Sequence, residues 1–131
     1  MKKIFILLTM CYTLGCSKSG GNGGGNINQE QEISFSLNAN DNIISPANNF
    51  PVNVILNSTM PGKGIRISAS LMQQSNNNTI SQNPSINSTA NSNGITIINL
   101  PEQQWCQATV TVTSIDKPSN SSSKSFTVVY K

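Results

Sequence analysis

Apolar and polar side chains alternate along most of the chain beyond residue 30, and this period of two constrains the fold more than any other feature. Successive side chains of a β-strand point to opposite faces, so strict alternation predicts antiparallel strands with one buried and one wet face. The apolar positions fall in six segments: Ile33, Phe35 and Leu37; Val52, Val54 and Leu56; Ile65, Ile67, Ala69 and Leu71; Ile95 and Ile97; Cys106, Ala108, Val110 and Val112; and Phe126, Val128 and Tyr130. A weaker segment at 79–81 is a candidate seventh strand.

Clusters of Asn, Pro and Gly separate these segments, as turns between strands require. They lie at 48–51, 60–64, 76–78, 83–84, 91–94 and 116–120. The last of them is expected to close a hairpin. Short strands at this spacing over about 100 residues predict one all-β sandwich domain over residues 30–131.

The stretch from Leu100-Pro101 to Val112, with its alternating ATVTVT, resembles the corner before the sixth strand of immunoglobulin-like and fibronectin-type-III-like domains. The resemblance implies a single antiparallel immunoglobulin-like β-sandwich of about six or seven strands. In that family a Tyr usually stands six residues after the Leu. Here Cys106 holds that place, with Trp105 beside it.

The N-terminus has the layout of an export signal. Lys2 and Lys3 precede an apolar run over residues 4–14, which is too short to span a hydrocarbon core of about 30 Å and fits the apolar region of a signal peptide. The run ends in Thr13-Leu14-Gly15-Cys16, which resembles the bacterial lipobox, with Thr13 where Leu is usual. The resemblance implies a lipoprotein whose signal, residues 1–15, is removed and whose Cys16 carries a diacylglyceryl thioether and further acyl groups such as palmitate.

Two other interpretations of this N-terminus are an ordinary secretory signal with an incidental Cys and a cytosolic protein with an apolar start. The composition after Cys16 favours lipidation, because the run from Ser17 to Asn26 is rich in Gly, Ser and Asn. Flexible linkers of this kind hold a domain off a bilayer, so residues 16–29 are expected to be a tether. We expect an outer-membrane lipid anchor, with the domain facing the periplasm or the outside.

Composition argues against several function classes. Charged residues make up 10% of the chain, whereas about 25% is usual, and Asn and Ser are abundant instead. Without Lys2 and Lys3 the charges nearly balance, which gives no reason to expect nucleic acid as a partner. The chain has no His, the commonest general base and metal ligand. We therefore expect no catalytic residue, metal or cofactor. Cys106 is the one Cys that remains after the signal is removed and Cys16 is lipidated, and we expect it to be a buried small hydrophobe rather than a nucleophile.

Trp105 is the single Trp and is flanked by Gln103, Gln104 and Gln107. Its parity is opposite to that of Cys106, so it either covers one end of the core or points outward. An exposed ring could stack on a sugar while neighbouring amides bind the hydroxyls. Two hypotheses follow: a non-enzymatic structural or protein-binding module of the bacterial envelope, and a carbohydrate-binding lipoprotein that uses Trp105, Gln103 and Gln107. The expected partners are the membrane, through Cys16, and an envelope protein or a glycan.

Overall fold

A computed structural model describes residues 29–131, and within this range strands are the only regular elements. The predicted signal peptide, Cys16 and the tether up to residue 28 lie outside the described residues. The strands are β1 (Phe35–Leu37), β2 (Ile43–Ser45), β3 (Phe50–Leu56), β4 (Ile65–Gln73), β5 (Thr79–Ile80), β6 (Ile86–Ser88), β7 (Ser92–Ile97), β8 (Cys106–Ser114) and β9 (Ser121–Tyr130). The predicted all-β class is confirmed. No helix long and apolar enough to cross a membrane occurs in this part of the chain.

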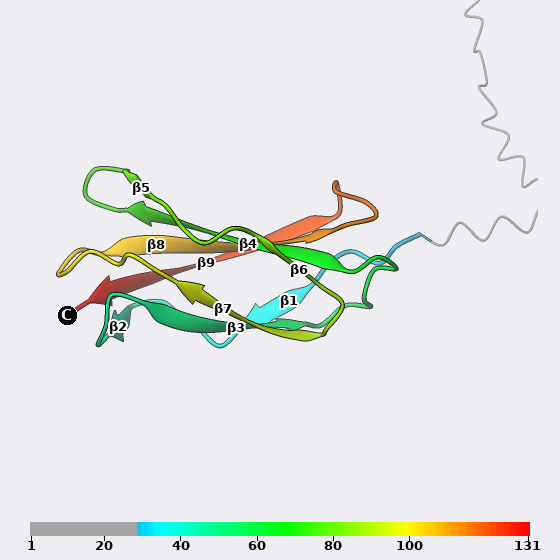
Figure 1. Cartoon of the computed structure of the whole chain (residues 1–131), viewed down its shortest axis with the longest axis horizontal. Helices are drawn as coiled ribbons and strands as arrows, with labels where there is room; N and C mark the ends of the chain where they lie inside the picture. The colour runs from blue at the N-terminus through cyan, green and yellow to red at the C-terminus, as the bar shows by residue number, and fades with distance from the viewer. Residues whose placement is uncertain (1–28) are drawn as a thin grey trace, which may run out of the picture.

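The strands form two sheets that face each other (Figure 1). The smaller sheet has the order β1-β3-β7, and the larger has the order β2-β9-β8-β4-β5, with β6 also paired to β4. The long pairs β4–β8, β8–β9 and β3–β7 are antiparallel, and the predicted hairpin at 116–120 joins β8 to β9.

The expectation of six or seven purely antiparallel strands is wrong in two respects. Residues 29–131 form nine strands, because β2 and β6 were not predicted, and β2 pairs with β9 in parallel through the register Ile43↔Val128. β2 and β6 are each three residues long. Strands this short show too few alternations to be recognised, and their partners are far away in sequence.

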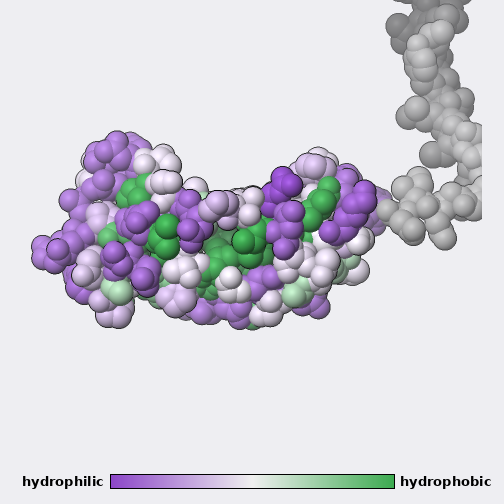
Figure 2. All heavy atoms as spheres, in the orientation of Figure 1, coloured by the Kyte–Doolittle hydropathy of each residue, from purple (hydrophilic) through white to green (hydrophobic). Residues whose placement is uncertain are grey.

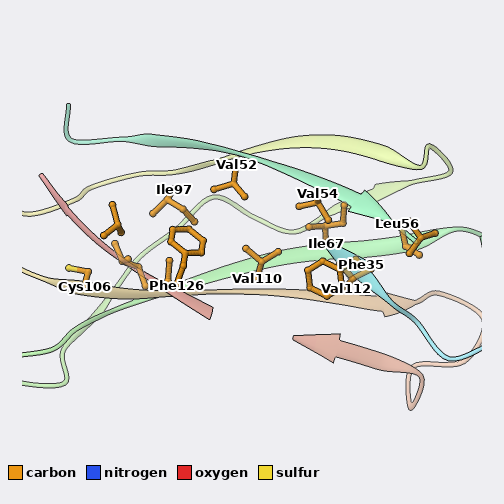
Figure 3. Close-up of a cluster of buried hydrophobic side chains, with 14 of the residues drawn as sticks. Phe35, Val52, Val54, Leu56, Ile67, Ile97, Cys106, Val110, Val112 and Phe126 are labelled. Atoms are coloured by element: carbon orange, nitrogen blue, oxygen red, sulfur yellow. The ribbon is translucent and has the colours of Figure 1, made fainter. Parts of the chain in front are cut away.

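The buried faces of the two sheets form one core, as the alternation predicts. Along β8 the even-numbered residues from Cys106 to Ser114 are buried and the odd-numbered ones are half-buried. Figure 3 shows Val52 and Ile97 of the smaller sheet directed toward Phe126 of the larger one. The rings of Phe50 and Phe126 meet edge to face across the two sheets, with centroids 6.0 Å apart. Such pairs add to the stabilisation from burial alone.

The described chain begins against the β8–β9 turn, where Asn120 holds it. The Asn120 amide donates to the Glu30 carboxylate at 2.6 Å and to the Gln31 carbonyl at 2.9 Å, and its oxygen accepts from the Ile33 N–H at 2.9 Å. Ser114 adds a hydrogen bond to Glu30 at 3.0 Å. The chain therefore enters the domain at one end of β8, and Trp105 precedes the other end of that strand.

Candidate functional site

Trp105 lies half-buried just before β8. Its carbonyl accepts the Gln74 N–H at 3.0 Å, which extends the β4–β8 pairing by one residue beyond Gln73↔Cys106. Its parity is that of Gln107, which lies on the outer face of the larger sheet, opposite the core. Trp105 is not among the described residues that pack against the core cluster.

The structure brings the predicted glutamines to the same end of the molecule as Trp105 but does not gather them into one cluster. Gln103 is exposed with a φ of 57°, and its N–H donates to the Tyr130 carbonyl at 2.7 Å. Gln107 lies within β8, between Met72 of β4 and Thr127 of β9. The backbone of each of these two residues is fixed by the fold, and the side-chain amide of each remains available to a ligand.

An amide cluster at this end was not predicted from the sequence. Gln104 accepts hydrogen bonds from the Gln73 amide and, at 3.3 Å, from the Ser75 hydroxyl. Gln73 and Ser75 are about 30 residues away in sequence and reach Gln104 only because β4 pairs with β8. The signal that could have found them is the matching register of two alternating strands.

Further along β8, on the same face as Gln107, three pairs of hydroxyl side chains connect β8 to β9. They join Thr109 to Ser125 at 2.8 Å, Thr111 to Ser123 at 2.8 Å and Thr113 to Ser121 at 2.9 Å. We call this set the hydroxyl ladder. In the first two pairs one of the two donors is used internally, so one donor and several lone pairs remain for water or a polar ligand. In the third pair the Ser121 hydroxyl also donates to the Val112 carbonyl at 3.3 Å.

Cys106 has no exposed surface, which confirms its predicted place in the core. Burial raises the pKa of its thiol above the ordinary value of 9.0, so the thiol is protonated at neutral pH. Its sulfur lies 3.8 Å from the Gln104 carbonyl oxygen. Within residues 29–131, no group of three or more His, Cys, Asp or Glu side chains is placed to hold a metal ion.

The edge of β7 differs from the other sheet edges. β1, β2, β5 and β6 each have three residues or fewer, whereas β7 has six, Ser92-Asn93-Gly94-Ile95-Thr96-Ile97. Natural edge strands are usually kept from pairing with other chains by shortness, charge, Pro or a bulge. The residues of β7 include no charge and no Pro, and they pair with β3 in continuous register.

The hydrogen-bond phase of the β3–β7 pair shows which groups of β7 face outward. Leu56 N–H donates to the Asn91 carbonyl at 2.8 Å, just beyond the end of the pair. Hydrogen-bonded and non-hydrogen-bonded pairs alternate in an antiparallel pair, so Asn93, Ile95 and Ile97 bond to β3. The backbone groups of Gly94 and Thr96 therefore point away from β3, toward the open side.

A hollow of about 230 Å³ lies beside this edge, between the two sheets. Ile67 and Ala69 of β4 and Ile95 of β7 line it together with Pro84 and Ile86, and none of its lining residues is charged. Ile86 is one of the large hydrophobic side chains that remain exposed, at 40%. In Figure 2, hydrophobic residues follow the middle of this side of the molecule between polar margins. The hollow and the β7 edge together are called the β7 groove below.

Compared with known proteins, the chain matches no protein-family model and no curated sequence.

Proposed function

We propose that this chain is a lipid-anchored, non-enzymatic module of the bacterial envelope, and that its immunoglobulin-like domain binds another protein. The lipid on Cys16 provides the anchor, and residues 16–29 are the tether. Acyl chains contribute about 0.8 kcal/mol per buried CH₂, so two or more of them hold a protein firmly on a membrane. The domain is then free to meet partners while it stays at the envelope.

The strand order supports the immunoglobulin-like part of the proposal. In that fold one sheet contains the first, second, fourth and fifth strands, and the other contains the third, sixth and seventh. Here β1-β3-β7 corresponds to the first sheet without its fourth strand, and β4, β8 and β9 correspond to the second. The additional strands β2, β5 and β6 occupy the edges of the larger sheet.

The observation that carries the protein-binding proposal is the β7 groove. A long, uncharged edge strand beside an exposed apolar hollow is the kind of surface that soluble monomers usually protect. This chain keeps it open along the flank of the domain. A protein partner that covers this edge would explain why the domain retains it.

Photo-crosslinking in the cells that make the protein tests this function. Asn83 is exposed on the rim of the β7 groove, and p-benzoylphenylalanine in its place is expected to form a covalent adduct with a protein partner. Ser119, exposed at the β8–β9 turn, is the matched control and is expected to give little adduct. Equal adducts from both positions, or none from either, would contradict protein binding at this surface.

Carbohydrate binding is a second candidate, because Trp105 has the parity of Gln107, which lies on the outer face that carries the hydroxyl ladder. Trp105 is partly exposed, and an aromatic ring beside amides and hydroxyls suits a sugar. Tryptophan fluorescence tests this candidate directly, since Trp105 is the single Trp. A spectrum that shifts on addition of a polysaccharide and loses the shift in Gln107→Ala supports sugar binding. A spectrum unchanged by polysaccharides contradicts it.

A further inference from the structure

We propose that the β7 groove binds an extended, uncharged peptide segment of the partner protein, which adds to β7 as a new antiparallel or parallel strand. This inference rests on the proposed function and specifies the chemistry of the partner. The bound segment pairs its backbone with Gly94 and Thr96 and places small apolar side chains in the hollow.

Gln82 already occupies one position of this edge in the way that a strand would. Its side-chain amide accepts the Ile98 N–H at 2.9 Å and donates to the Ile98 carbonyl at 2.8 Å. Ile98 has the same parity as Gly94 and Thr96, so all three direct their backbone groups to the same side. The amide of Gln82 thus imitates one peptide unit of an added strand, and the next two outward-facing positions remain available.

The hollow suits side chains better than a whole small molecule. Its volume, about 230 Å³, is below the roughly 300–1,000 Å³ of pockets that enclose drug-sized ligands. In strand addition, backbone hydrogen bonds give affinity and pockets for alternate side chains give specificity. Ile67, Ala69 and Ile95 offer the apolar surface for such side chains, and the uncharged lining leaves a charged one without a counter-ion.

A second copy of this chain fits the β7 groove less well than a single peptide does. Pairing two β7 strands brings a whole sheet up to the edge, where the segment around Gln82 and Pro84 forms the rim. Because Gln82 holds Ile98, a symmetric pair is left with little more than Gly94 and Thr96 on each side. An isolated extended segment has no sheet behind it and avoids the rim.

The test uses isotope-labelled full-length protein in detergent micelles and a capped heptapeptide of alternating valine and threonine with lysine at both ends. The peptide is expected to shift the Gly94 and Thr96 amide resonances and to slow their hydrogen exchange. The same peptide, N-methylated at alternate amides, keeps its side chains but loses donors toward β7. Loss of two net hydrogen bonds predicts binding weaker by roughly tenfold or more.

Two variants at Gly94 provide the matched pair on the protein side. Gly94→Pro removes the outward N–H without removing a bond to β3, and the loss of this one hydrogen bond is expected to weaken peptide binding by roughly twofold to tenfold. Gly94→Ala keeps the N–H, and its added Cβ has no atom within 4 Å, so it is expected to bind like the wild type.

Equal binding of the methylated peptide, peptide-induced changes away from Gly94 and Thr96, or no binding of the peptide would overturn strand addition. Concentration-dependent dimers that protect Gly94 without peptide would also overturn it and indicate a second copy as occupant. If crosslinks from Asn83 form in cells while the peptide fails, protein binding stands and only the strand mode falls.

Discussion

Val110 lies in the middle of β8 with no exposed surface, while its neighbour Thr111 faces outward and pairs with Ser123. Val110→Asp buries an unpaired carboxylate and is expected to cost about 3–5 kcal/mol of unfolding free energy, a large part of the stability of a small domain. Thr111→Asp is the matched control and is expected to cost about 1 kcal/mol or less. Denaturant unfolding followed by tryptophan fluorescence measures both, and equal midpoints for the two variants would show that the register is wrong.

The buried thiol of Cys106 predicts a dependence of stability on alkaline pH. Burial raises its pKa in the folded state, so the thiol ionises first in the unfolded chain, at about its ordinary value of 9.0. Its contribution to stability is therefore complete below pH 9.0 and is lost as the pH rises through the higher pKa of the folded state, at up to about 1.4 kcal/mol per pH unit. Urea unfolding of wild type and Cys106→Ala between neutral and alkaline pH measures the difference. A difference that stays constant across this range would contradict the assignment.

Hydrogen exchange tests the orientation of β7 at the level of the element. The amides of Asn93, Ile95 and Ile97 bond to β3 and are expected to exchange slowly, while those of Gly94 and Thr96 exchange fast. Gln82→Ala should speed exchange at Ile98 and leave Ile97 slow, because the Gln82 amide is the partner of Ile98. Uniform exchange along β7 in NMR spectra would mean that Gly94 and Thr96 do not face away from β3.

The long elements were predictable from sequence because their own side chains record which face is buried. β3, β4 and β8 alternate over seven to nine residues, and the positions predicted to be buried from that alternation are buried except Ala69, which is half-buried. β2 and β6 are held by distant partners, and three residues cannot show this in advance. The same holds for Gly64, whose φ of 88° and close approach to the Ser88 carbonyl depend on where β6 lies.

The candidate site likewise has features that the sequence could predict and features that it could not. The alternation predicted that Cys106 is buried, and it has no exposed surface. For Trp105, the residue before it, the sequence left two placements open, outward or over the end of the core. The β7 groove could not be predicted, because it requires knowing that β7 is an edge strand and that the chain between β5 and β6 leaves part of β4 uncovered. Edge position is a property of topology, and a single strand's composition does not contain it.

At the scale of the whole molecule, the proposed anchor and the proposed contact surfaces occupy different places. The described chain enters beside Asn120 at one end of β8, and Trp105 lies beyond the other end of this nine-residue strand. At about 3.3 Å per residue, the two ends are roughly 30 Å apart. If residues 16–29 are a tether, it joins the domain at the first end, so it does not need to cover Trp105 at the other end.

The proposed envelope function depends on the proposed lipid anchor at Cys16. Cys16→Ala removes the sulfur that would carry the diacylglyceryl group, so the protein is expected to lose palmitate labelling and to leave the membrane fraction. Cys11→Ala is the matched control, since bulky Met10 precedes Cys11 and makes it the poorer acceptor, and this variant should remain labelled and membrane-bound. Metabolic labelling with palmitate and fractionation of the cells measure both effects. Labelling that persists in Cys16→Ala would place the lipid on another residue and leave the tether starting elsewhere.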